Sequence, residues 1–323
     1  MAVYTQLNSK DISDFLKNYN IGDLVSFKGI IDGIDNSNFI IETSIGRYIL
    51  TIFESRINKN ELPFFINLKK HLAGQDICCP EPIQNNSGHL INDLKDKPAL
   101  IVSFLNGAIL RPQQNGIYNN ITTKHCFEIG RNLAILHLGS SNFEEFREND
   151  LGVARFDDLF NKMQYEIENY EPGLCIKINQ YLSLIKTNWR DNLKSGAVHV
   201  DLFPDNVFFD ENAKVSGVID FYFAANDLLI YDLAIVINAW CFNQDNQLNQ
   251  EKYNQVLKGY EEVRKLPDEE KSFLPTALLA ASVRFLLTRL YDKFNTPSDS
   301  LVNIKDPQEY IQKAHFFSKN LNS

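Results

Sequence analysis

The sequence predicts an α+β fold of two lobes, a small lobe built on an antiparallel β-sheet followed by a larger, mainly helical lobe. Two observations carry this prediction. Runs rich in β-branched and aromatic residues, punctuated by glycines, lie before Gly107, whereas the segments after it repeat apolar residues with a helical period. A continuous apolar run over residues 99–105 separates the two regions, so we expect lobes at residues 1–105 and 106–323.

The first lobe should hold a helix ahead of its strands. Residues 9–19 place Ile12, Phe15 and Leu16 on one face, and Ser9 stands where a capping residue is expected. The β-rich runs predict strands over residues 24–31, 38–43, 48–53 and 99–105, and a further helix is expected over residues 62–72.

The second lobe should be helical except for one β-hairpin. Apolar periodicity predicts helices over residues 122–138, 156–170, 175–189, 231–242, 250–263, 273–292 and 307–321. Two short apolar runs, residues 207–209 and 215–219, predict the hairpin.

Composition and charge exclude several classes of protein. The chain is 44% hydrophobic and 23% charged, as globular proteins are, and its net charge of −9 argues against nucleic acid or an anionic membrane as partner. The N-terminus lacks the basic start and apolar run of a signal peptide. The most apolar stretch, residues 228–240, is too short to cross a bilayer. The five cysteines show no paired metal spacing, so we expect reduced thiols and a cytoplasmic location.

The most informative segment runs from His199 to Asn206. His199 and Asp201 are separated by one residue, Asn206 follows five residues after Asp201, and an apolar strand comes at once. Asp220 follows at the end of the second strand of the hairpin. The alternative is an ordinary hairpin in which Asp, Pro and Asn merely form the turn.

This spacing matches the catalytic loop of kinases. Phosphoryl transfer from ATP needs one carboxylate to take the proton of the acceptor hydroxyl, which we assign to Asp201. It also needs oxygen ligands for Mg²⁺, which we assign to Asn206 and Asp220. With the lobe order above, the chain is expected to have a protein-kinase-like two-lobe fold. We expect His199 to brace the loop, His137 to cap its helix or be packed, and Asp232 to cap its helix.

The region after Asp220 indicates a small-molecule acceptor. Only about ten residues separate Asp220 from the next expected helix, whereas a protein kinase places an activation loop there to dock a polypeptide. Tyr222 and Asn226 in this stretch are candidates for the acceptor site, although they are equally compatible with packed turn residues.

Several blocks of the chain resemble a known family. They are residues 1–5, 33–39, 46–51, 62–65, 199–209, 219–224, 231–234 and 238–242. Together they resemble the aminoglycoside phosphotransferase/choline kinase-like superfamily and, within it, the homoserine kinases. The resemblance implies ATP- and Mg²⁺-dependent phosphorylation of L-homoserine to O-phospho-L-homoserine, a step of threonine biosynthesis. The alternatives are a kinase for choline, an aminoglycoside or a methylthioribose-like sugar, and a non-catalytic nucleotide-binding pseudokinase.

The resemblance also implies where the nucleotide lies. The expected contacts are the turn at Gly33, Asn36, Ser37 and Asn38, the strand position Thr51, and the adenine-side backbone near Ser103 and Leu105. Thr51 stands where kinases carry a lysine for the α- and β-phosphates, so the sequence leaves open what replaces that charge.

One polar stripe on the expected helix 273–292 is a candidate acceptor site. Arg284, Thr288 and Tyr291 recur at helical spacing among apolar neighbours. A buried arginine requires an anion, and its planar fork suits a carboxylate. The alternative is a structural ion pair between Arg284 and an acidic residue of a neighbouring helix.

Overall fold

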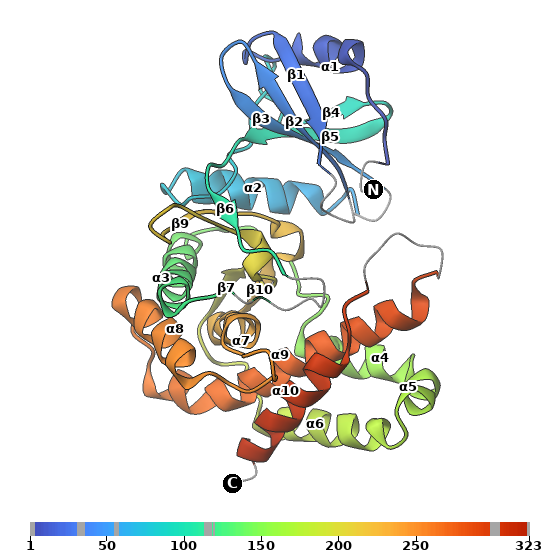
Figure 1. Ribbon diagram of the computed structural model, residues 1–323, viewed down its shortest axis with the longest axis vertical. Helices are drawn as coiled ribbons and strands as arrows, with labels where there is room; N and C mark the ends of the chain where they lie inside the picture. The colour runs from blue at the N-terminus through green and yellow to red at the C-terminus, as the bar shows by residue number, and fades with distance from the viewer. Residues whose placement is uncertain are drawn as a thin grey trace. The chain divides into compact units, whose positions relative to one another are not determined.

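The computed structural model describes residues 4–30, 36–54, 58–112, 118, 120–297 and 304–321. Two compact units compose it (Figure 1). The first unit comprises residues 1–106 and 217–219, and the second comprises residues 107–216 and 220–323. The arrangement is α+β, with an antiparallel sheet in the first unit and mostly helices in the second.

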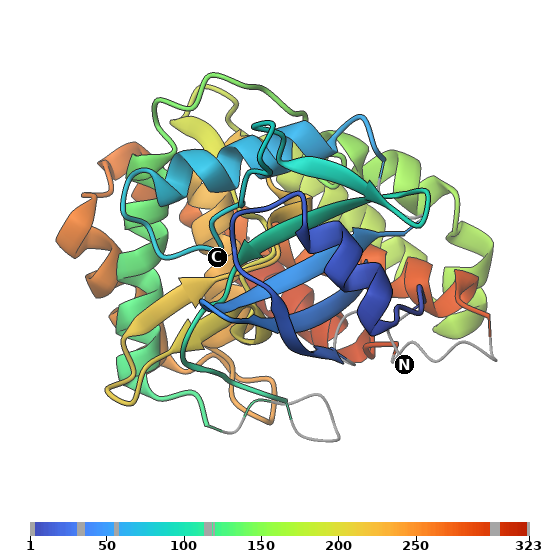
Figure 2. The same cartoon turned by 90° about the horizontal axis from the view of Figure 1, so that it is seen from above.

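A five-stranded antiparallel sheet forms the first unit. Its strand order is β1-β2-β3-β5-β4, and the strands are β1 (Leu24–Gly29), β2 (Asn36–Thr43), β3 (Arg47–Phe53), β5 (Lys97–Ser103) and β4 (Ile91–Leu94). Helix α1 (Ser9–Leu16) lies across one face, as Figure 2 shows, and buries its apolar side against the sheet. The second helix is α2 (Leu62–Ala73).

The start of α1 differs from the expectation. Ser9 was expected to cap the helix, but Asn8 does so: its side chain accepts the N–H of Asp11 at 3.0 Å, and the Asp11 carboxylate accepts the N–H of Asn8 at 3.0 Å. This reciprocal pair satisfies two donors that the helix itself leaves unpaired.

Helices and short strands form the second unit. The helices are α3 (Thr123–Gly139), α4 (Phe156–Asn161), α5 (Gln164–Tyr170), α6 (Leu174–Asn188), α7 (Leu229–Trp240), α8 (Gln250–Val263), α9 (Asp268–Asn295) and α10 (Gln308–Leu321). Three single turns are η1 (Val153–Arg155), η2 (Pro204–Asn206) and η3 (Phe221–Phe223). The strands are β6 (Ala108–Ile109), β7 (Ser195–Val198), β8 (Val207–Phe209) and β10 (Ala225–Leu228), together with the first two residues of β9 (Val215–Val218), whose last two residues belong to the first unit.

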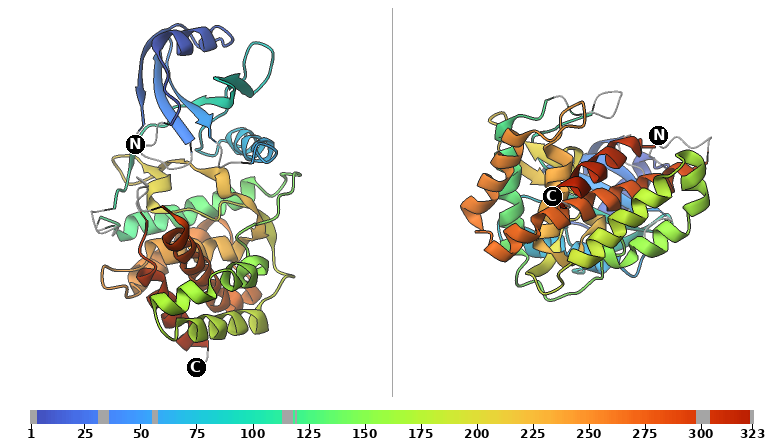
Figure 3. Two further views of the ribbon diagram at one scale, coloured as in Figure 1. Left: turned by 90° about the vertical axis from the view of Figure 1, so that its right-hand side faces the viewer. Right: turned by 90° about the horizontal axis from the view of Figure 1, so that it is seen from below.

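Helix α9 is the core of this unit. It packs against α6, α7 and α10, and Figure 3 shows α10 running alongside it. Among the described residues, α9 is the one helix that is long and apolar enough to cross a membrane. However, 89% of its most apolar window is buried inside the protein. That burial is expected of the central helix of a folded unit.

Helices α3 and α8 cross at two glycines. A Cβ atom added at Gly130 would lie 2.1 Å from the carbonyl oxygen of Val256, and one at Gly259 would lie 2.0 Å from that of Phe127. The absence of side chains at both positions therefore allows the two backbones to touch. This contact fixes α3, which carries His137 in its last turn.

Candidate active site

The segment between β7 and β8 carries two residues of the predicted catalytic set. Asp201 follows β7, and Asn206 ends η2 just before β8 begins. The side-chain amide of Asn206 donates to the main-chain carbonyl of Asp201 at 2.8 Å and lies 3.4 Å from its Oδ2 atom. The loop therefore holds these two half-buried side chains together.

Asp232 of α7 ties this loop to the helical core. Its carboxylate accepts the backbone N–H of His199 at 3.0 Å and that of Val200 at 2.8 Å. Our expectation that Asp232 caps its own helix was wrong, because the N-cap residue is Leu228 and Asp232 lies fully buried in the first turn. A buried carboxylate requires donors, and the amides of the loop supply them.

Two histidines support the same arrangement. His137 is packed, as expected, with Nε2 3.1 Å from Asp232 Oδ2 and Nδ1 2.7 Å from the hydroxyl of Tyr260. His199 braces the loop, as expected, by accepting the N–H of Asp201 at 3.3 Å. Burial acts to raise the pKa of Asp232, but the hydrogen bond from His137 and the two imidazoles bring it below the ordinary value. Asp232 therefore remains an anion.

Arg284 of α9 bonds the loop one residue before Asp201. It is buried, and its Nη1 atom donates to the main-chain carbonyl of Val200. Val200 has a φ of 53°, in the left-handed region that a β-branched residue rarely adopts. Asp232 on its N–H and Arg284 on its carbonyl together hold this conformation. Within the described part of the chain, Arg284 forms no ion pair of the kind that we weighed as an alternative, and its buried Nε atom lacks a hydrogen-bond partner.

The environment of Asp201 makes it a stronger base. Burial raises the pKa of its carboxyl group, and the positive charge of Arg284 only partly opposes this effect. A carboxylate with a raised pKa accepts a proton more readily near neutral pH.

Asp220 and the two acceptor candidates follow β9. Asp220 is exposed, has a left-handed φ of 66°, and directly precedes η3, which contains Tyr222. In β10, the side-chain oxygen of Asn226 accepts the backbone N–H of Arg147 at 2.9 Å, and the backbone N–H of Asn226 donates to the Arg147 carbonyl at 2.7 Å. Asn226 thus joins two segments of the second unit, which is the packed role that we weighed as its alternative.

In the first unit, Asn36 and Ser37 belong to a buried polar network. Ser37 is fully buried, and its hydroxyl accepts the N–H groups of Tyr4 and Thr5 at 2.8 and 3.0 Å. It donates to the carboxylate of Glu54 at 2.6 Å. The side-chain oxygen of Asn36 accepts the N–H of Glu54 at 3.4 Å. These side chains tie the start of β2 to the N-terminal segment and to the end of β3.

Thr51 and Asn38 face each other across β3 and β2. They are register partners, and the Thr51 hydroxyl donates to the side-chain oxygen of Asn38 at 2.7 Å. Thr51 is buried and neutral, so this strand position supplies a hydrogen-bonding group instead of the charge that a lysine would supply.

The predicted adenine-side residues lie at the end of β5. The backbone N–H of Ser103 already donates to the carbonyl of Glu81 at 2.9 Å, and its hydroxyl accepts the N–H of Glu81 at 2.9 Å. Leu105 packs on Gly217, where an added Cβ would lie 2.5 Å from the leucine side chain. Gly33 lies outside the described residues.

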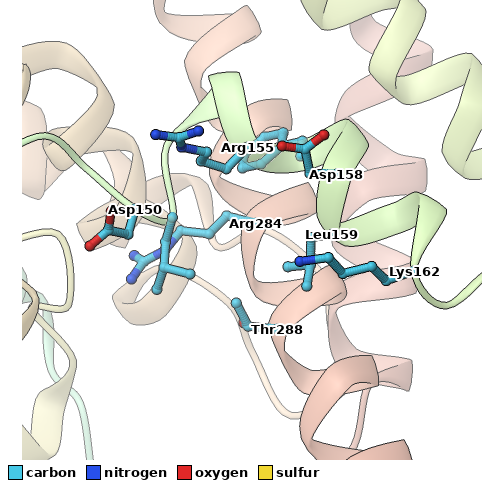
Figure 4. Close-up of a pocket in the computed structure, with 9 residues that line it drawn as sticks. Asp150, Arg155, Asp158, Leu159, Lys162, Arg284 and Thr288 are labelled. Carbon is cyan, nitrogen blue, oxygen red and sulfur yellow. The ribbon is translucent and has the colours of Figure 1, made fainter. Parts of the chain in front are cut away.

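A pocket opens beside Arg284 in the second unit. Its volume is about 260 Å³, and Arg284 and Thr288 line it together with residues of the segment 150–162 (Figure 4). Tyr291, the third member of the expected stripe, is 43% exposed and does not line the pocket. The charged residues contributed by α4 gave no signal in the sequence, because they look like an ordinary solvated helix face.

The donor set fits Mg²⁺ better than a protein-enclosed metal. Among the described residues, no group of three or more His, Cys, Asp or Glu side chains converges on one point. Magnesium is commonly held by one or two protein oxygens together with substrate phosphates. The amide oxygen of Asn206 and the carboxylate of Asp220 are hard donors of this kind.

Comparison with known proteins identifies the family. The model of the phosphotransferase enzyme family matches residues 26–266. Homoserine kinases from Xanthobacter autotrophicus and Parvibaculum lavamentivorans are each 44% identical to the chain, and each match covers 98% of this chain and 96% of the relative. A homoserine kinase from Rhodospirillum rubrum is 43% identical with the same coverage.

Solved structures of small-molecule kinases share the fold. A spectinomycin phosphotransferase bound to ADP and spectinomycin aligns with a TM-score of 0.67 at 13% identity, covering 99% of both chains. A choline kinase from Streptococcus pneumoniae aligns with a TM-score of 0.63 at 15% identity, covering 97% of this chain and 98% of that one. At such identities the structures show the fold, whereas the sequence relatives show the family. The chain belongs to the phosphotransferase enzyme family and, within it, to the homoserine kinases.

Proposed function

We propose that the protein transfers the γ-phosphoryl group of ATP to the side-chain hydroxyl of L-homoserine, giving O-phospho-L-homoserine and ADP. The observation that carries the proposal is the Asp201–Asn206 loop, in a chain 44% identical over almost its full length to homoserine kinases. The reaction would be a step of threonine biosynthesis.

Asp201 is the proposed base. The acceptor O–H bond breaks and its proton passes to the Asp201 carboxylate, while the hydroxyl oxygen forms a bond to the γ-phosphorus. The bond from that phosphorus to the β–γ bridging oxygen breaks, and its electron pair leaves with ADP. The raised pKa of Asp201 suits this role, because the proton is accepted more readily.

Asn206 and Asp220 are the proposed ligands of Mg²⁺, which when bound neutralises charge on the phosphates. Asn206 keeps its amide nitrogen on the Asp201 carbonyl, so its side-chain oxygen is oriented away from that bond and is available to a cation. The same side chain thereby positions both the base and the metal.

The nucleotide is proposed to bind the first unit. Its phosphates would lie at the segment around Gly33 that leads into Asn36, Ser37 and Asn38, with the hydroxyl of Thr51 nearby. Since Ser37 and Asn36 already bond protein partners, their contribution would come through the backbone that they hold in place. The adenine would lie against the end of β5, where Leu105 follows the already bonded Ser103.

A coupled assay of ADP release tests the function. The purified protein is supplied with Mg·ATP and, in turn, L-homoserine, choline, an aminoglycoside and a methylthioribose-like sugar. We expect turnover with homoserine above all others, and mass spectrometry of the product should show one added phosphate. Release of ADP with another acceptor and none with homoserine would overturn the assignment.

The variant Asp201→Asn tests the mechanism. A general base contributes about 10²–10⁴-fold to rate, so kcat should fall by an amount equivalent to about 3–5 kcal/mol of transition-state stabilisation. Binding of Mg·ATP, measured by calorimetry, should remain. A folded variant with nearly normal kcat would exclude Asp201 as the base.

A further inference from the structure

The pocket beside Arg284 has walls from three elements of the second unit. Arg284 and Thr288 belong to α9, while Arg155 ends η1 and Asp158 and Lys162 come from α4 and its C-cap. Figure 4 shows the Lys162 side chain extending toward the side of the pocket where Arg284 and Thr288 lie. Residues far apart in the sequence thus meet around one space of about 260 Å³.

Two of the charged side chains at the pocket already have partners. Arg155 pairs with Glu148 at 3.1 Å, and Asp150 pairs with Arg147 at 2.6 Å. The Arg155–Glu148 pair is exposed on both sides and contributes little to stability, whereas the Arg147 side chain of the other pair is only 15% exposed. The two pairs do remove one cation and one anion from those available to a ligand.

Two cations remain for a ligand. In the part of the chain that the structure covers, Lys162 has no ion-pair partner, although Asp158 lies one helical turn away. The Nε atom of Arg284 is buried without a hydrogen-bond partner in that same part, and Arg284 itself is only 2% exposed. A buried guanidinium N–H left unbonded costs free energy, which an anionic ligand would recover.

We propose that Lys162 and Arg284 bind the α-carboxylate of the amino-acid acceptor, with the Thr288 hydroxyl beside them. This inference rests on the proposed function and deepens it by assigning the acceptor's specificity to α4 and α9. Asp158 is the carboxylate available to the acceptor's ammonium group, because Asp150 is bonded to Arg147.

The pocket is joined to the catalytic loop through one side chain. Arg284 donates to the carbonyl of Val200, which directly precedes Asp201. A carboxylate bound by Arg284 would therefore contact a side chain that also fixes the backbone of the proposed base. An acceptor without a carboxylate would leave Arg284 without this partner, and such unpaired buried groups are how polar sites reject analogues.

Lys162→Gln is the variant that tests the site. Lys162 is exposed at the end of α4, so its replacement should leave the fold intact, whereas a change at buried Arg284 endangers it. The KM for L-homoserine should rise about fivefold or more, with kcat and the KM for ATP nearly unchanged. The matched control is Lys186→Gln: Lys186 pairs with Asp157 of α4 at 2.6 Å but does not line the pocket, and its variant should behave as wild type.

A second acceptor separates carboxylate binding from general damage. 3-Aminopropanol keeps the amine and hydroxyl of homoserine but lacks its carboxylate, so Lys162→Gln should leave its kcat/KM within about twofold of wild type. Equal loss with both acceptors, or no loss with homoserine, would overturn the inference.

Binding without turnover distinguishes this inference from the proposed function. Calorimetry of L-homoserine with the Asp201→Asn variant, alone and combined with Lys162→Gln, measures acceptor affinity directly, and the added change should weaken it about fivefold or more. If wild type does not phosphorylate homoserine, the proposed function fails. If it does so while the Lys162 change alters neither KM nor affinity, only the carboxylate site is wrong.

Discussion

Replacing Asp232 by Asn tests whether this buried carboxylate positions the catalytic loop. Asp232 accepts hydrogen bonds from the N–H groups of His199 and Val200 and lies 3.1 Å from His137. An asparagine of the same shape keeps one acceptor oxygen and turns an NH₂ group toward donors. One or two of the three hydrogen bonds must therefore be lost.

The magnitude follows from those contacts. A hydrogen bond to a charged group contributes about 1.5–3 kcal/mol, so the variant should lose about 2–5 kcal/mol of stability. Domains are typically stable by about 5–15 kcal/mol, so much of the variant should remain folded at 25 °C. Val200, at a φ of 53°, would lose the bond that holds its N–H and would relax toward commoner conformations. A shift of about 1 Å in Asp201 is enough to lower kcat about 10²-fold.

The assay combines thermal unfolding with steady-state kinetics corrected for the folded fraction. The matched control is Glu270→Gln, because Glu270 is another buried carboxylate of the second unit and accepts two bonds from Arg264 at 2.7 Å. Both variants should unfold at a lower temperature than wild type, but only Asp232→Asn should show a lower kcat in the folded fraction. A normal kcat in folded Asp232→Asn, or an equal loss in the control, would refute the positioning role.

Three further changes have separate readouts. Asp220→Ala should abolish turnover and weaken Mg²⁺-dependent ATP binding, and metal titrations matching wild type would exclude Asp220 as a ligand. Gly130→Ala places a Cβ 2.1 Å from the Val256 carbonyl oxygen and should lose about 1–3 kcal/mol in chemical denaturation, whereas Gly74→Ala, with no contact under 3.4 Å, should not. Burial acts to raise the pKa of Glu309, but Lys313 and Arg289 hold it at about 2. The ionised Glu309 therefore stabilises the folded protein above the unfolded pKa of about 4.3, and this contribution is lost as pH falls toward 2. Because Glu309 is 34% exposed, Glu309→Gln should cost only about 1–2 kcal/mol at pH 7, and its difference from wild type should vanish in melts near pH 2.

Periodic helices were predictable because their signal is local. Helix α8 begins and ends at the expected residues, Gln250–Val263, and α10 differs by one residue at its start. The expected helix over residues 156–170 is instead two helices, α4 and α5, separated at Lys162 and buried Met163. Neither glycine nor proline marks that break, so tertiary packing imposes it. It leaves Lys162 at a helix end beside the pocket.

Short strands and long-range contacts had no such local signal. Strands β7 and β10 have four residues each and pair across the intervening residues 199–224, so neither could be recognised alone. The type and spacing of Asp201, Asn206 and Asp220 indicated the chemistry directly. The role of Asp232 did not follow from the sequence, because the amides that it accepts lie 32 and 33 residues away in the chain.

The first unit explains why the protein should depend strongly on a divalent cation. At the proposed phosphate site, Thr51 is neutral and its hydroxyl bonds Asn38. On the neighbouring strand, Lys97 is paired with Glu54, whose carboxylate also accepts the hydroxyl of Ser37. This pair brings no net positive charge to the start of β2. In the proposed nucleotide site, the negative charge of the phosphates would therefore be balanced mainly by Mg²⁺ held at Asn206 and Asp220. Metal binding and ATP binding should then be more tightly coupled than in a kinase whose strand carries a lysine on the phosphates.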